Sequence, residues 1–186
     1  MRYLRSNRKG FTLVELIVVI GIIGIVVSTI GTFLVSNVKT FHYADDQMEV
    51  QYQAQIAMNE LVDRVVEAEG IESIAYVGAT STINEIVFRI FTNKKYIKYE
   101  YDRSSTIRNL KRGEVEGESV PQIAIDNITT NQYAMYVENC QITFLPSSAS
   151  GPADAAGIQI TITTKKNNVS VMLTNEVYFR NWEPSP

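Results

Sequence analysis

The feature that most constrains this chain is an apolar stretch near its N-terminus, residues 11–35, which holds one ionisable side chain, Glu15, and no proline. As a helix rising about 1.5 Å per residue, it would be roughly 37 Å long, enough to cross a hydrocarbon core of about 30 Å. The stretch therefore predicts a membrane span. Four basic residues and no acid lie in residues 1–10, which predicts that this end stays in the cytoplasm and the C-terminal bulk lies outside.

The helical pattern continues beyond the span. Neither proline nor glycine occurs between residues 32 and 69, and residues 42–55 are mostly polar. Apolar residues recur at helical spacing at Leu34, Val38, Phe41, Met58, Leu61, Val62 and Val65. We therefore predict one helix over residues 11–69 that stops near Gly70, with an amphipathic second half at residues 36–69.

After Gly70 the apolar period changes from 3.6 to 2, which is typical of strands. The alternation predicts a three-stranded meander and three later strands, namely residues 86–91, 96–101, 107–111, 135–145, 158–164 and 169–179. Two stretches read as loops, residues 113–122 and 146–157, and residues 165–168 read as a hairpin turn. Residues 70–186 thus predict an antiparallel β-sheet on which the last turns of the helix pack, an α+β fold.

Charge and cysteine content exclude several classes of function. The formal net charge is −3, and without residues 1–10 the chain keeps 13 basic against 20 acidic side chains, a net charge of −7. Such a product has no basic stripe for phosphates, so no nucleic-acid partner is expected. Cys140 is the only cysteine and predicts a small core residue, while the only histidine, His42, predicts a surface position on the helix. No catalytic motif occurs, and we expect no enzyme, cofactor or metal site.

Two weaker patterns stay open as alternatives. Alternating acids in the loop 113–122, together with Asp126, could bind Ca²⁺, although a solvated acidic loop is favoured. Aromatic and basic residues around residues 96–101 could stack single-stranded DNA, although an ordinary strand face is favoured. These residues are Tyr96, Tyr99, Tyr101, Lys94, Lys95 and Lys98.

Residues 9–17, which read KGFTLVELI, resemble the type IV prepilin signature, which also marks type II secretion and competence pseudopilins. A secretory signal peptide is disfavoured because the apolar stretch is too long and holds an acid near its start. A simple uncleaved anchor is the other alternative. The resemblance implies that prepilin peptidase cleaves between Gly10 and Phe11 and that the same enzyme methylates the new N-terminus at Phe11. Gly10 suits this role because it has no side chain to obstruct the peptidase.

Glu15 is the costly residue of the span, since acidic residues inside membranes are rare and functional by default. The resemblance implies a partner for it, the α-amino group of Phe11 in a neighbouring subunit, as the helices assemble into a filament. The alternative is that Glu15 reaches the headgroups from its place four residues into the span. Small residues at three- and four-residue spacing would allow close helix packing, namely Gly21, Gly24, Ser28 and Gly31.

The rest of the chain resembles minor pilins and minor pseudopilins of the PilW and GspJ type, through residues 51–69, the tyrosine-rich hairpins, and residues 110–113 and 177–181. The single Cys140 forbids the disulfide-closed loop that many major adhesive pilins carry. The resemblance therefore implies a minor pilin near the filament tip or in the initiation complex, with other major and minor pilins as partners. It would be anchored once in the cytoplasmic membrane and then displayed in a pilus or pseudopilus at the cell surface.

Two alternatives to the minor pilin stay open. One is a minor pseudopilin of a type II secretion or competence system. The other is a single-pass anchored binding domain that does not polymerise. The predicted division of the chain is a cleaved leader at residues 1–10, a span used for assembly at 11–35, an amphipathic helix at 36–69 and a sheet region at 70–186.

Overall fold

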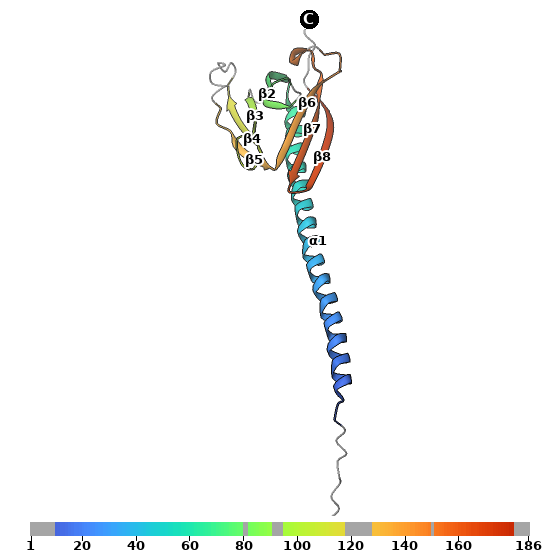
Figure 1. Ribbon diagram of the computed structural model, residues 1–186. Coiled ribbons are helices and arrows are strands. Elements are labelled where there is room, and N and C mark those ends of the chain that lie inside the picture. The colour runs from blue at the N-terminus through green and yellow to red at the C-terminus, as the bar shows by residue number, and fades with distance from the viewer. Residues whose placement is uncertain (1–9, 80–81, 91–94, 118–127, 150, 181–186) are drawn as a thin grey trace, which may run out of the picture. The chain divides into compact units, whose positions relative to one another are not determined.

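The N-terminal half of the chain is dominated by one helix (Figure 1). The computed structural model describes residues 10–79, 82–90, 95–117, 128–149 and 151–180. Helix α1, Leu13–Glu67, has 55 residues, which confirms the predicted single helix to within two residues at each end. Gly70 is the first residue of strand β1 and has no positive φ, so it does not serve as a left-handed helix cap.

The chain forms two compact units, residues 1–44 and 45–186, which divide inside α1. The described part of the first unit consists of Gly10 to Thr12 and the first half of the helix. The second unit contains the remainder of α1 and all of the described strands.

The first sheet of the second unit is antiparallel and five-stranded, in the order β1-β2-β3-β4-β5. Its strands are β1 (Gly70–Tyr76), β2 (Ile83–Ile90), β3 (Lys95–Asp102), β4 (Asn109–Glu116) and β5 (Asn131–Met135). The predicted meander is confirmed as β2, β3 and β4. The expected loop over residues 113–122 is wrong at its start, because residues 113–116 pair with β3 as part of β4.

Strands β1 and β5 were not predicted. In β1 the pairing register shifts between Ile71 and Ser73, so its apolar residues do not alternate regularly along the sequence. Strand β5 has only five residues and begins with two polar ones. Both strands therefore lack the period-2 pattern on which recognition from sequence depends.

A second antiparallel sheet has the order β6-β7-β8, with β6 (Val137–Leu145), β7 (Gly157–Lys166) and β8 (Val169–Tyr178). The prediction of one sheet is therefore wrong. The predicted strand 135–145 is broken at Tyr136, whose φ of 59° turns the chain out of one sheet and into the next. The hairpin between β7 and β8 is confirmed, with Asn167 at a φ of 53°.

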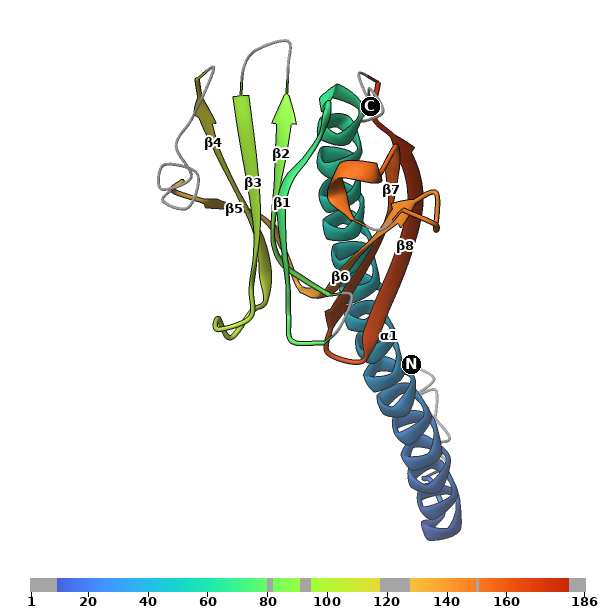
Figure 2. The ribbon, with the colours of Figure 1, turned by 90° about the horizontal axis from the view of Figure 1, so that it is seen from above.

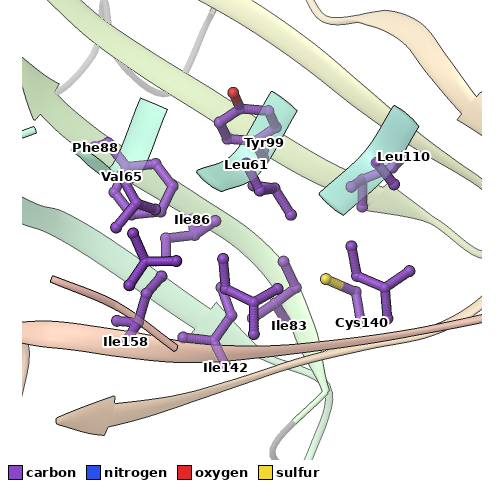
Figure 3. Packing of buried hydrophobic residues seen from close by; sticks show 14 of the residues in the cluster. Leu61, Val65, Ile83, Ile86, Phe88, Tyr99, Leu110, Cys140, Ile142 and Ile158 are labelled. Atoms are coloured by element: carbon purple, nitrogen blue, oxygen red, sulfur yellow. The ribbon is translucent and has the colours of Figure 1, made fainter. Parts of the chain in front are cut away.

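Both sheets lie beside the second half of α1 (Figure 2), and all three share one hydrophobic core (Figure 3). Leu61 and Val65 of α1 lie against Ile86 and Phe88 of β2, while Cys140 contributes from β6. The predicted stripe on α1 is confirmed at Met58, Leu61 and Val65, with Val62 only half buried. Its earlier members, Leu34, Val38 and Phe41, are exposed. Its packed face starts earlier than expected, and comprises Val50, Gln53, Ala54, Ala57, Met58, Leu61 and Val65.

Polar contacts hold this helical face in register with both sheets. Gln53 accepts a hydrogen bond from the backbone N–H of Met135 at 2.9 Å, and the Thr164 hydroxyl donates to the carbonyl of Val50 at 2.8 Å. Asp46 contacts the β7–β8 hairpin. It forms an ion pair with Lys166 at 3.1 Å and accepts a hydrogen bond from the side chain of Asn167 at 2.7 Å. A buried hydrogen bond left unmade costs about 1–3 kcal/mol, so these contacts disfavour sliding of the helix.

Candidate functional site

The three described residues before α1 are not helical. Gly10, Phe11 and Thr12 precede the first helical residue, Leu13, and all three are exposed. Phe11 is 86% exposed. The Gly10–Phe11 peptide bond thus lies in open chain, the condition under which a peptidase can take it in an extended form. The expected basic leader, residues 1–9, lies outside the described residues.

Thr12 and Glu15 form a reciprocal cap on the first turn of α1. The backbone N–H and the hydroxyl of Thr12 donate to Oε2 of Glu15 at 2.9 and 3.0 Å, and the N–H of Glu15 donates to the Thr12 hydroxyl at 3.2 Å. This is the capping-box arrangement, in which the N-cap residue and the third helical residue satisfy each other's orphan donors. It holds the Glu15 carboxylate at the N-terminal end of the helix.

The capping box leaves one carboxylate oxygen for another group. Among the described residues, Oε1 of Glu15 has no hydrogen-bond partner, while Oε2 accepts both bonds from Thr12. Thr12 was not among the residues expected from the sequence, although a threonine three residues before a glutamate, at the start of an apolar run, is a known signal of a capping box. The geometry can therefore offer a fixed anionic oxygen to a cation beside the helix start.

The remainder of the span has the surface expected of a helix in lipid. It is the one helix in the described part of the chain that is long and apolar enough to cross a membrane, and its most apolar window has no buried residue. The hydroxyls of Thr29 and Thr32 donate to the carbonyls four residues earlier, at 2.9 and 3.0 Å. These polar groups are thus satisfied inside the helix, as a hydrocarbon environment requires.

The four small residues of the span, Gly21, Gly24, Ser28 and Gly31, share one side of the helix, within about 80° at 3.6 residues per turn. A Cβ atom at any of the three glycines would meet nothing within 4 Å. Ser28 is exposed as well. This side is therefore open to a second helix, and its use for packing stays a prediction.

Comparison with known families bears on this segment. Residues 5–31 match the family described as the prokaryotic N-terminal methylation motif. The chain carries the type IV prepilin and pseudopilin signature. The match covers the Gly10–Phe11 bond, Glu15 and the four small residues, while the sheets lie outside it. No curated protein and no solved structure matches the chain.

The α+β architecture of this prepilin-type chain, a long apolar helix packed on antiparallel sheets, agrees with the pilin-like fold that the sequence predicted. His42 is exposed on α1, as expected. Cys140 is fully buried, which confirms it as a core residue, and burial raises the pKa of its thiol to about 12. The thiolate that nucleophilic chemistry requires is therefore scarce at neutral pH.

The aromatic platform considered for DNA does not exist on the surface. Tyr96, Tyr99 and Tyr101 are 9%, 0% and 3% exposed. Lys98 is also buried and forms an ion pair with Glu85 at 2.8 Å. The physical reason is that both faces of β3 are covered, so its rings pack in the interior; Lys94 lies outside the described residues.

The two described acidic residues considered for Ca²⁺, Glu114 and Glu116, are engaged in ion pairs. Lys95 lies 3.5 Å from Glu114 and 3.0 Å from Glu116, and Arg112 contacts Glu114 at 2.7 Å. The Arg112 guanidinium lowers the pKa of Glu114. Glu118 and Asp126, the other two candidates, lie outside the described residues.

Proposed function

We propose that this chain is a minor pilin, made as a membrane-anchored prepilin and assembled into a type IV pilus through α1. The observation that carries the proposal is the methylation signature at residues 5–31, most of which lies on a helix, from Leu13 onward, whose span is exposed along its whole length. The partners are prepilin peptidase and other pilins. The protein is anchored in the cytoplasmic membrane before assembly and is then displayed in a filament at the cell surface.

Processing at Gly10–Phe11 is supported by the local structure. Cleavage removes residues 1–10 and leaves Phe11 as an N-terminal residue directly before the capping box of Thr12 and Glu15. Methylation of the Phe11 amine retains its positive charge. The new ammonium group and the Glu15 carboxylate are then complementary charges at the same depth in every subunit.

Assembly through Glu15 follows from the cost of an isolated charge in lipid. Its Oε1 oxygen is directed to no described group, so the Phe11 ammonium of an adjacent subunit can approach it while Thr12 holds Oε2. The small-residue side of the helix, including Gly24 and Ser28, then permits the close approach that this pairing needs.

Exposed apolar residues continue along α1 beyond the span and extend the surface available to a second helix. Met48 and Tyr52 are 65% and 59% exposed. Met48 lies nine residues before the packed Ala57, and Tyr52 lies nine residues before the packed Leu61. Nine residues turn an α-helix by about 180° beyond whole turns, so both exposed residues are on the side opposite to the packed face. Within the second unit, one side of α1 packs on the sheets and the other presents apolar side chains to solvent.

The choice of a minor subunit is supported by the lone, buried Cys140, which leaves no disulfide-closed loop of the kind many major adhesive pilins carry. The resemblance of residues 51–69 to minor pilins and pseudopilins points the same way. A tip or initiation-complex position is part of the proposal. Deleting the gene tests the system it serves: loss of surface fibres supports the pilus, whereas loss of protein export or DNA uptake with fibres intact identifies a pseudopilin.

The processing step is tested by N-terminal sequencing and mass spectrometry of the protein purified from membranes. We expect an N-methylated Phe11 as the first residue. Gly10→Val serves as the blocked control, because its branched side chain obstructs the peptidase, and should retain residues 1–10. An intact Met1 in the wild type, or a new terminus beyond residue 25, would contradict the proposal.

The assembly step is tested with Glu15→Gln. Glutamine can still accept the Thr12 N–H in a capping box but has no charge, so the helix start is kept while the ion pair is lost. We expect cleaved protein to accumulate in the membrane and to co-purify poorly with other pilins. Thr12→Ser, which keeps the hydroxyl, is the matched control and should assemble normally. Wild-type co-purification of Glu15→Gln would show that Glu15 only reaches the headgroups.

A further inference from the structure

Strand β8 is an unusually regular sheet edge. All ten of its residues pair with β7 without a register shift. On its other side, no strand pairs with it in the part of the chain that the structure describes. It contains no proline and a single charged residue, Glu176. Edges of this kind are templates for a strand from another chain, and proteins that do not use them usually disrupt them.

The other three sheet edges of the domain are disrupted or capped. Strand β1 carries two register shifts. Strand β5 is short, and Gln53 occupies the N–H of its last residue, Met135. Strand β6 is bridged through Gln141 to Thr82, which precedes β2. Among the described strands, three edges are therefore disrupted or capped, and the longest regular edge, that of β8, has no strand paired with it.

The backbone groups that β8 leaves free can be assigned. The N–H of Phe179 donates to the carbonyl of Ala156 at 3.0 Å, in continuation of the β7–β8 register. Because backbone groups in an antiparallel ladder alternate in direction, odd-numbered residues of β8 face β7 and even-numbered residues face the open side. The even-numbered residues also have exposed side chains, namely Ser170, Met172, Thr174, Glu176 and Tyr178.

We propose that the open edge of β8 receives an extended segment of a different pilin-type subunit by strand addition. This inference rests on the proposed function for the class of the partner. The segment would hydrogen-bond to the backbone of the even-numbered residues and place apolar side chains beside the half-buried Val171 and Leu173. It would be neutral or basic opposite Glu176, the one charge on the strand.

Strand direction argues against a second copy of this chain. The β7–β8 hairpin contacts Asp46 near the beginning of the packed part of α1, and Arg180, just after β8, contacts the carbonyl of Val66 near its end. Strand β8 therefore runs in the same direction as α1. Copies that repeat in one orientation along a filament, as the proposed function requires, present parallel β8 strands and cannot form the antiparallel pair that two identical edges favour.

The test uses the full chain in its own membranes. A photoreactive benzoylphenylalanine replaces Met172, Thr174 or Glu176 in turn, and Thr161 serves as the control. Thr161 is on β7, opposite Thr174 and 3.0 Å from its hydroxyl, so it shares the sheet face but not the edge. We expect all three edge positions to form adducts with one segment of one pilin-type subunit. The crosslinked residue of that segment should shift by two for each step of two along β8. We expect no adduct from Thr161.

Three results would overturn the proposal: no adducts from the edge, equal adducts from Thr161, or edge adducts with a second copy of this chain. Correctly cleaved protein without edge adducts would refute strand addition alone. An uncleaved N-terminus in the same samples would refute the proposed function, whatever the edge binds.

Blocking variants give an independent readout. Thr174→Pro removes an N–H that faces the open side and not β7, and Thr174→Lys adds a charge to the edge. Thr174→Pro should lower the adduct yield from position 172 about tenfold, the equivalent of one lost hydrogen bond, and Thr174→Lys should also lower it, while Thr174→Ser leaves it unchanged. Resistance of the domain to protease shows whether each variant is folded. If the Pro variant is unfolded, the Lys variant alone provides the test. Undiminished yields in the folded variants would overturn the proposal.

Discussion

Replacing Leu61 by alanine tests whether α1 is the element that joins the two sheets. Leu61 is completely buried and belongs to the core shared by β2, β3, β4, β6 and β7. Its truncation removes the transfer free energy of the lost side-chain carbons and leaves a cavity, because a closely packed core relaxes only partly around the site. Such Leu→Ala changes cost about 2–5 kcal/mol, and the complete burial of Leu61 places the expected loss near about 3 kcal/mol.

The assay is thermal unfolding of a soluble chain that begins at residue 36, followed by circular dichroism. We expect a cooperative transition, because this chain omits the span but keeps the whole core. For a chain of about 150 residues, a loss of about 3 kcal/mol lowers the Tm by about 6–12 °C. The domain's total stability should be about 5–15 kcal/mol, so the variant still folds at low temperature.

Tyr52→Ala is the matched control for Leu61→Ala. It truncates a larger side chain on the same helix, but Tyr52 is 59% exposed on the side opposite to Leu61. Exposed substitutions usually change stability by less than about 0.5 kcal/mol, so its Tm should move by at most about 2 °C. Equal Tm values for the two variants, or no cooperative transition in the wild-type chain, would refute this account of the core.

Two further predictions concern ionisable groups. Cys140 should resist thiol reagents at pH 7 in the folded soluble chain, because burial raises the pKa of its thiol to about 12, and should react once the chain is unfolded. Labelling at equal rates in both states would contradict this prediction and show that the site opens readily. The hydrogen bond from Lys111, with those from Ser104, lowers the pKa of Asp102 below its unfolded value of about 3.9. A lowered pKa adds stability that is present above about pH 4 and is lost as the pH falls further. The Tm of Asp102→Asn should therefore fall less between about pH 5 and pH 3 than the Tm of the wild type. An identical fall would contradict this assignment.

Much of the fold could be predicted because it depends on patterns that are local in the sequence. The helix over Leu13–Glu67 follows from an apolar run and the absence of helix breakers, and strands β2, β3, β7 and β8 follow from regular alternation. Strands β1 and β5 could not be recognised in this way. Their places are decided by pairing with β2 and β4, which are distant in the sequence, and by register shifts that break the period.

The N-terminal site is likewise a local feature. The signature that contains the Gly10–Phe11 bond and Glu15 could be recognised, since a membrane segment must satisfy its hydrogen bonds within itself and makes any charge conspicuous. The roles of these residues stay predictions. The capping box of Thr12 and Glu15 was not predicted, although it depends only on a spacing of three residues and is therefore equally local.

The sequence by itself determined the span, the single long helix and the α+β class, because each follows from periodicity and composition over neighbouring residues. Only the tertiary structure decided that the strands divide into two sheets at Tyr136 and that the tyrosines of β3 are buried rather than exposed. It also decided that no described strand pairs with the outer edge of β8. The physical reason is that burial and strand pairing are relations between distant segments. A residue's own neighbours specify its backbone preference, but not which surface covers its side chain.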